Sequence, residues 1–421
     1  MAKYDFDSYP LYEAKRHNVH VVKVRVILTE TIKGDVLKEA SEKAFKRFSY
    51  YQKSFDVDEE GGFLLVDNDK PICVFEGDNV ITLGSKETNG LLFAISYEKN
   101  NIYFNFAHNF CGVSGAMPWI KATLYYYLIK LGHNISTTAI LTEDDPITKE
   151  ECAEPDVNSL PNRDALGSFD FTRDSFTARA DYFARMQDPN GTDRYYPISI
   201  PKDQFMNYAK RNDGSPISIL SALFLKMVVR AQPNEQKFTV GIANNYRADV
   251  GCPETYRDMI RNIYVQYNAS MADWSIDKLS TITRGRMFLQ MQPEISYSQI
   301  RKVDTLHSNI DKIIGLDKKA DYAIANSLLI NGIPFSYYIS YVGKVDWGDL
   351  SPFILGVYTL TFGHLVFEIN ATNDKFCITF QTVRKDDLYL KEFLQILEQE
   401  GFSYSIDEPV DRKLPKMLLP N

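Results

Sequence analysis

Apolar and polar residues alternate in several short stretches of this chain, and residues with a helical period follow. Residues 18–30, NVHVVKVRVILTE, show the period of two that is typical of a half-buried strand. Residues 33–51 have apolar residues at helical spacing, and Asp35 is placed to cap that helix. Strand and helix patterns that recur in this way predict a mixed α/β fold in which helices cover a sheet.

Further strands are expected in the first half at 61–68, 71–77 and 91–109, the last being a hairpin that turns at 99–101. This hairpin leads directly into the stretch of the chain that carries most of its functional interest.

Residues 104–128, FNFAHNFCGVSGAMPWIKATLYYYL, pass from a strand through a glycine-rich turn into a helix. We expect the helix over 116–131, with Pro118 in its first turn, where a missing backbone N–H is tolerated. Its three consecutive tyrosines, residues 125–127, are interpreted as packing residues of this helix.

Residues 141–192 differ from what precedes them, since they are acidic, contain prolines and lack apolar periodicity. We place the crossover between two domains at 146–190. The strand and helix patterns then recur, with strands expected at 195–201, 237–246, 335–345, 353–374 and 375–383, and helices from Ser215, within 275–319 and over 385–401, where Gly401 is the C-cap. The chain thus divides into two mixed α/β halves, residues 1–145 and 191–421.

Length and composition agree with a soluble two-domain protein. A chain of 421 residues exceeds one ordinary hydrophobic core, and its net charge of −8 argues against a nucleic-acid partner. The five cysteines never form a CxxC pair, so neither a disulfide framework nor a metal site is indicated. No signal core and no apolar run of 18 residues occurs, so we expect no membrane span. We expect a monomer in a reducing, cytoplasmic location.

His108 is the candidate catalytic residue that the pattern itself offers. It ends a strand and precedes a glycine turn, which is where side chains reach the clefts at the edge of a sheet. Imidazole accepts a proton near neutral pH, so His108 is a candidate general base. The alternative is a histidine that only hydrogen-bonds a backbone carbonyl, and the residues alone leave both readings open.

The run FAHNFCGVSGAMPWIKATLYYYL, residues 106–128, resembles the HxxxDG region of the superfamily of chloramphenicol acetyltransferase and nonribosomal-peptide condensation domains. The resemblance is closest to bacterial alcohol acetyltransferase-like proteins. Residues 6–51, 240–262 and 335–350 resemble further segments of that group, in the expected order.

The resemblance implies two chloramphenicol-acetyltransferase-like halves that form a pseudodimer around a central channel. An acyl group on a CoA or carrier-protein thioester would enter from one side, and a small hydroxyl or amine acceptor from the other. His108 would deprotonate the acceptor, which attacks the thioester directly. The implied activity is therefore that of an acyltransferase (an acetyltransferase in the relatives named), with no bound cofactor and with acyl-CoA or an acyl-carrier thioester as co-substrate.

The chain departs from this pattern at the motif itself. Gly112 stands where the family has its aspartate, Val113 where it has its glycine, and Ala107 precedes His108 instead of a second histidine. The family aspartate pairs with an arginine, whose counterpart here would be Arg247 in NNYR. A buried Arg247 without that carboxylate needs compensation. Three candidates for it are Asp249, Asp346 and an anionic ligand.

Four further residues are considered for the site. Ser340 is a candidate oxyanion donor by analogy, although a plain strand serine is an equal interpretation. Ser114 is either a channel residue or the cap of the following helix. Trp347 is a candidate channel or loop residue. Cys111 is expected to be a small buried hydrophobe rather than a nucleophile, because no acid or base stands at a recognised spacing.

Two other functions remain open at this stage. One is a catalytically lapsed member that binds an acyl ligand or a partner protein, since the motif lacks its aspartate. The other is a condensation-type, amide-forming protein that works with carrier proteins. The missing second histidine and the negative net charge disfavour the latter, because carrier proteins are themselves acidic.

Overall fold

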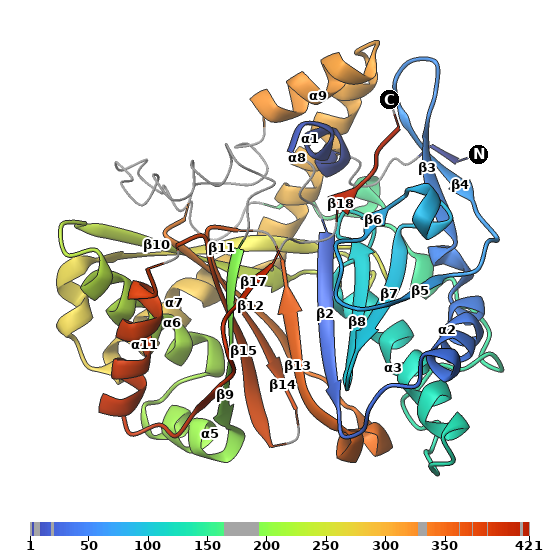
Figure 1. The fold of residues 1–421 in the computed structure, drawn as a ribbon. Coiled ribbons are helices and arrows are strands. Elements are labelled where there is room, and N and C mark those ends of the chain that lie inside the picture. The colour runs from blue at the N-terminus through green and yellow to red at the C-terminus, as the bar shows by residue number, and fades with distance from the viewer. Residues whose placement is uncertain are drawn as a thin grey trace.

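The computed structural model of the chain describes residues 2–3, 9–17, 21–163, 193–326, 335–361, 363–372, 374–384, 386–412 and 416–420. Two large sheets lie side by side in the middle of the molecule, and helices cover the two opposite flanks (Figure 1). The expected mixed α/β fold with two halves is confirmed. The crossover expected at 146–190 lies partly outside the described residues. Its described part contains the short 3-10 helices η3 (Glu150–Cys152) and η4 (Val157–Ser159).

The first half is built on a five-stranded sheet in the order β13-β2-β8-β7-β5. β8 lies between β2 and β7, so all seven of its residues are buried. The elements of this half are β2 (Val21–Leu28), β5 (Cys73–Glu76), β7 (Phe93–Glu98), β8 (Asn101–Ala107), α1 (Tyr9–His17), α2 (Gly34–Arg47), α3 (Val113–Lys130), η1 (Ser49–Tyr51) and η2 (Lys86–Thr88). Beside them a small sheet pairs β1 (Ala2–Lys3), β4 (Phe63–Asp67) and β3 (Lys53–Val57) in the order β1-β4-β3.

Two helix starts in the first half differ from the expectation. The N-cap of α2 is Lys33, so Asp35 lies inside the first turn, where its charge favours the helix dipole but caps nothing. α3 begins at Val113, three residues early, because extended Gly112 is its N-cap. Pro118 therefore lies inside the helix and not in its first turn, and its ring removes one N–H from the hydrogen-bond ladder.

The second half is built on an eight-stranded sheet in the order β11-β10-β12-β14-β15-β9-β16, with β17 also paired to β9. Its strands are β9 (Asp193–Pro201), β10 (Lys237–Asn245), β11 (Ile260–Asn268), β12 (Tyr337–Lys344), β14 (Leu365–Ala371), β15 (Lys375–Thr382), β16 (Ser405–Ile406) and β17 (Val410–Arg412). β11 was not expected from the sequence. It pairs along its whole length with β10, and the segment 246–259 connects the two strands.

The helices of the second half cover the outer flank of its sheet or extend over one end of the molecule (Figure 1). They are α5 (Lys202–Arg211), α6 (Pro216–Ala231), α7 (Ile276–Gln290), α8 (Pro293–Asp311), α9 (Leu316–Ala325), α11 (Leu388–Gln399) and η5 (Ala269–Asp273). The short helix η6 (Gly348–Phe353) instead lies against α3 of the first half and against β13 of its sheet. α6 starts as expected, because Ser215 and Ser218 form a reciprocal capping box. In the described ranges no single helix is long and apolar enough to cross a membrane, whereas α5 and α6 together pass that test by length and composition alone, with an 86° bend.

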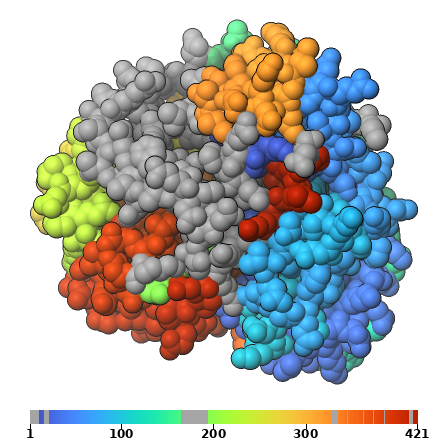
Figure 2. All heavy atoms as spheres, turned by 45° about the horizontal axis from the view of Figure 1, so that its top comes forward, coloured from blue at the N-terminus to red at the C-terminus, as the bar shows by residue number. Residues whose placement is uncertain are grey.

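The second half of the chain contributes strands to the sheets of the first half. β13 (Ile354–Leu360) follows β12 in the chain but pairs with β2 in the sheet of the first half. Near the C-terminus, β18 (Lys416–Met417) pairs with β6 (Thr82–Leu83). Figure 2 shows this red segment on the surface beside the blue and cyan residues of the first half. The core of the first half accordingly includes side chains from the second, such as Trp347 and Val357.

Candidate active site

His108 follows the last residue of β8, a central strand whose neighbours are both fully paired with it. Because the strand ends at Ala107 and α3 begins at Val113, the five residues between them form the turn at the edge of the sheet. One third of the His108 side chain is exposed. The strand therefore delivers an accessible imidazole to the end of the sheet, as the sequence pattern predicts for a candidate base.

Asp258 is the charged group of the described residues that lies within ion-pair range of His108. Its Oδ2 lies 3.3 Å from Nδ1 of the imidazole, a contact within ion-pair range that is not aligned as a hydrogen bond. Nδ1 is buried without a hydrogen-bond partner among the described residues, whereas Nε2 is not buried. Hydrogen bonds of catalytic groups are often long in ligand-free structures. The imidazole thus turns Nδ1 toward a carboxylate and leaves Nε2 open.

Asp258 also lies beside Gly112, the residue at the position of the family aspartate. A Cβ placed on Gly112 would lie 2.6 Å from Oδ1 of Asp258 and 3.5 Å from Nη2 of Arg247. The backbone of Gly112 is extended, with φ −79° and ψ 166°, which any residue adopts. The space beside Asp258, and not the backbone conformation, therefore limits which side chains residue 112 can carry.

Arg247 is buried with only 3% of its surface exposed, and its contacts differ from those expected. Nε donates to the carbonyl of Thr255 at 2.9 Å, and Nη2 donates to the carbonyl of Arg257 at 2.5 Å. Backbone carbonyls of the segment 246–259 therefore accept from the guanidinium directly. These hydrogen bonds lie within the segment and fix its conformation around the guanidinium, which lies beside Gly112.

Neither aspartate proposed as a substitute partner contacts Arg247. Asp249 accepts a hydrogen bond from the hydroxyl of Ser296 at 2.5 Å, and that hydroxyl also accepts from Arg261 at 3.0 Å. Asp346 accepts from the backbone N–H of Gly348 at 3.0 Å and shapes the turn before η6. The expectation that one of them compensates Arg247 is wrong. The carboxylate beside position 112 comes from Asp258.

A second carboxyl group, Glu368, is buried on β14 with 3% of its surface exposed. Burial raises its pKa, although the hydroxyls of Ser340 and Thr361 and the charge of His108 act in the opposite direction. Thr361 donates to Oε1 at 2.8 Å, while Oε2 is buried without a partner among the described residues. The influence of His108 on this carboxyl places Glu368 in the electrostatic surroundings of the candidate base.

Ser340 lies on β12 directly opposite Glu368 in the parallel pair of β12 and β14. The Ser340 hydroxyl is close enough to the Glu368 carboxyl to lower the pKa of that group. The oxyanion role suggested by analogy stays a prediction.

Ser114 and Trp347 occupy different surroundings. Ser114 is the exposed second residue of α3, so it does not cap that helix. It lines a cavity of about 310 Å³ together with Lys121, Val342 and Asp346. Trp347 is 2% exposed and belongs to the core of the first half, so it cannot line an open channel.

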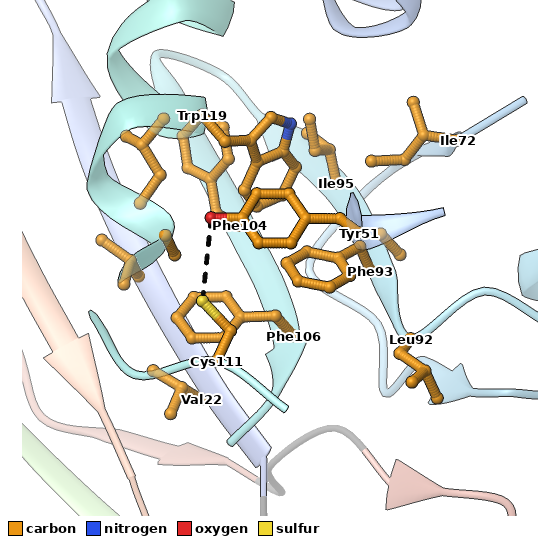
Figure 3. Packing of buried hydrophobic residues seen from close by; sticks show 14 of the residues in the cluster. Val22, Tyr51, Ile72, Leu92, Phe93, Ile95, Phe104, Phe106, Cys111 and Trp119 are labelled. Carbon is orange, nitrogen blue, oxygen red and sulfur yellow. Dashed lines mark hydrogen bonds between the residues drawn. The ribbon is translucent and has the colours of Figure 1, made fainter. Parts of the chain in front are cut away.

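Cys111 is a core residue, as expected. Its Sγ contacts the hydroxyl of Tyr51 at 3.9 Å, among the rings of Phe93, Phe106 and others (Figure 3). Burial is the largest influence on this thiol and raises its pKa well above the ordinary range. Because the thiolate is the nucleophilic form, Cys111 is poorly suited to carry an acyl group.

The residues that sequence reasoning missed are Asp258 and Glu368. Asp258 stands in the quoted segment CPETYRDMIRN, eleven residues after Arg247, but no spacing rule relates it to His108. Glu368 looked like an ordinary strand residue in LVFEIN. Asp258 reaches His108 through the segment 246–259, and Glu368 is related to it only through the fold of β14 in the second half. In the described part of the chain, no group of three or more His, Cys, Asp or Glu residues could hold a metal ion.

Comparison with solved structures identifies the fold. TRI101 of F. sporotrichioides, solved with coenzyme A and T-2, matches with a TM-score of 0.61 at 9% identity, covering 94% of this chain and 98% of that chain. Polyketide synthase associated protein 5 from Mycobacterium tuberculosis matches with a TM-score of 0.57 at 11% identity, over 94% and 96% of the two chains.

The condensation domain of the monacolin K polyketide synthase MokA matches with a TM-score of 0.53 at 10% identity, over 95% and 97%. No known sequence-family model matches the chain, and no curated protein matches it by sequence. The expected mixed α/β fold with two halves is therefore shared with TRI101 and with this condensation domain over nearly the full length. At these identities the similarity describes the fold alone.

Proposed function

We propose that this protein is an acyltransferase that moves an acyl group from a CoA or carrier-protein thioester to a hydroxyl or amine acceptor. The observation that carries the proposal is the accessible His108, with Nε2 open and Nδ1 facing a carboxylate, at the end of a central strand. The fold supports it, because a structural neighbour with the same architecture was solved with coenzyme A bound.

His108 acts as the general base in this reaction. Nε2 takes the proton of the acceptor's O–H or N–H while the acceptor atom bonds to the thioester carbonyl carbon. The carbon–sulfur bond then breaks, and the sulfur leaves with the proton that Nε2 returns to it. A positioned base of this kind is worth about 10²–10⁴-fold in rate. The burial of Cys111 supports direct transfer without an acyl-enzyme.

Two other functions stay in view, each on a specific observation. A lapsed, ligand-binding protein is favoured by the absence of the motif aspartate at Gly112. A condensation-type protein that takes its donor from a carrier protein is favoured by the match to condensation domains.

A panel of acyl-CoAs with hydroxyl and amine acceptors tests the proposal. We expect acceptor-dependent release of free CoA thiol and an acylated acceptor in mass spectra, while the intact protein keeps its mass. Binding of acyl-CoA without thiol release would favour the lapsed protein. Transfer from an acyl-carrier protein only would favour the condensation-type function. A stoichiometric acyl adduct on the protein would contradict direct transfer.

A further inference from the structure

The starting observation is that a carboxylate occupies the space next to residue 112 although residue 112 has no side chain. Oδ1 of Asp258 lies 2.6 Å from the position of a Cβ on Gly112, closer than real Cβ atoms approach. A side chain at residue 112 and the present position of Asp258 therefore exclude each other. Because the φ of Gly112 is ordinary, the backbone gives no separate reason for a glycine.

The same carboxylate reaches the candidate base with its other oxygen, at 3.3 Å from Nδ1 of His108. The Asp258 side chain is 19% exposed, and its Oδ1 is buried without a hydrogen-bond partner among the described residues. Nδ1 of His108 is likewise buried without one. A small rotation of either side chain would align an N–H at Nδ1 with a carboxylate oxygen of Asp258 as a hydrogen bond.

The charged or titratable groups near the turn after β8 come from different elements. Asp258 approaches His108 from the segment between β10 and β11, and the charge of His108 acts on buried Glu368 of β14. Arg247 lies beside Gly112, with its guanidinium hydrogen-bonded to backbone carbonyls. Of these groups, Asp258 is the one whose distance to the imidazole lies within ion-pair range.

We propose that Asp258 is the positioning residue of His108. The absence of a side chain at Gly112 leaves the space that the Asp258 carboxylate occupies. Asp258 accepts the Nδ1–H of the imidazole and so fixes the tautomer that leaves the Nε2 lone pair free for the acceptor's proton. This role rests on the proposed function. The carboxylate that the motif lacks at residue 112 is thus supplied by Asp258, which lies beside Gly112 and within ion-pair range of His108.

The tautomer of His108 gives a test that needs no substrate. In long-range ¹H–¹⁵N spectra of the full chain above the imidazole titration range, we expect His108 to carry its proton on Nδ1. The Asp258→Ala variant should shift it toward the Nε2–H form, with His108→Ala identifying the signal. Asp304→Ala removes an exposed carboxylate of α8 and should change nothing. An unchanged tautomer in Asp258→Ala would overturn the proposal.

Moving the carboxylate from residue 258 to residue 112 tests whether the two side chains compete for the same space. Gly112→Asp alone sets two carboxylates against each other and should lower the melting temperature. The double variant Gly112→Asp/Asp258→Gly should recover most of that loss, because one carboxylate again occupies the space. Equal melting temperatures of the single and double variants would mean that the two residues do not compete.

Kinetics separate this role from a purely structural one. Asp258→Ala should lower kcat by about 10-fold or more, but less than the loss of the base itself, with KM unchanged. A rise in KM with kcat unchanged would contradict positioning. If the wild-type protein transfers no acyl group, the proposed function fails, while the tautomer and the swap still decide the role of Asp258.

Discussion

Single residues in this protein take their roles from neighbours that lie far away in the chain. His108 and Gly112 stand where the resemblance puts them, but the carboxylate beside both comes from Asp258, about 150 residues later. Sequence patterns report spacing along one segment, so they identified the candidate base and the missing aspartate. They could not identify the replacement, because the contact forms only when the segment after β10 folds against the turn after β8.

Glu368 gives a prediction at the same scale. Burial raises its pKa in the folded protein. Between a pH of about 4.5, the ordinary glutamate pKa, and the raised pKa, the folded state therefore binds more protons than the unfolded state. Stability should therefore fall as the pH rises through this window. The Glu368→Gln variant lacks this titrating group, so its stability should not fall in the same way. The difference between its melting temperature and that of the wild type should grow in favour of the variant as the pH rises.

The control for this measurement is Glu59→Gln, which makes the same substitution at an exposed glutamate in the turn between β3 and β4. If Glu368→Gln and the wild type show the same pH dependence of melting, Glu368 is not the buried titrating group described here.

At the scale of elements, helix α3 and the segment 246–259 approach each other at a glycine. A Cβ on Gly115 would lie 1.9 Å from the carbonyl oxygen of Tyr256, so only glycine permits this contact. We expect Gly115→Ala to lower the free energy of unfolding by about 1–3 kcal/mol and to weaken the contact between His108 and Asp258. Denaturant unfolding and the His108 tautomer measure the two effects.

The matched control is Gly285→Ala. Gly285 lies in α7, its added Cβ would meet nothing within 4 Å, and the change should raise stability by about 0.5–1 kcal/mol. Equal effects of the two alanines would contradict a close approach at Gly115.

Most elements agree with local patterns in the sequence. The hairpin of β7 and β8 turns where expected, since Glu98 ends one strand and Asn101 begins the next. The start of α3 was misplaced because an extended glycine serves as its N-cap. β11 was missed because IRNIYVQYN follows a long irregular segment and mixes apolar with polar residues on both faces. These residues form a strand because they pair with β10, and a local sequence pattern does not report that pairing.

The whole molecule is more integrated than the order of its elements suggests. β13 completes the sheet of the first half, and β18 adds to β6, so both halves of the chain contribute to one core. Local alternation predicts strands but not the sheet that each one joins, so the pairing of β13 and β18 with first-half strands was not expected.

Separate expression tests this integration. Residues 1–145 alone would leave the edge of β2 unpaired and lose side chains such as Trp347 and Val357 from their core. We expect neither 1–145 nor 191–421 to fold cooperatively alone, and a fragment 1–345 that lacks β13 to fail as well. Circular dichroism melting measures this, with the full chain as reference. A cooperative transition in isolated 1–145 would show that β13 is dispensable.

The central claim is that His108 removes the acceptor's proton during direct acyl transfer. It is tested most directly by the single-turnover rate of thiol release from acyl-CoA, with acceptor present, in the wild type and in His108→Ala. His133→Ala is the matched control, because His133 has nearly the same exposure and also contacts a carboxylate, Glu30. The account predicts a rate at least about 10²-fold lower in correctly folded His108→Ala, and an unchanged rate in His133→Ala. A wild-type rate in His108→Ala would contradict it.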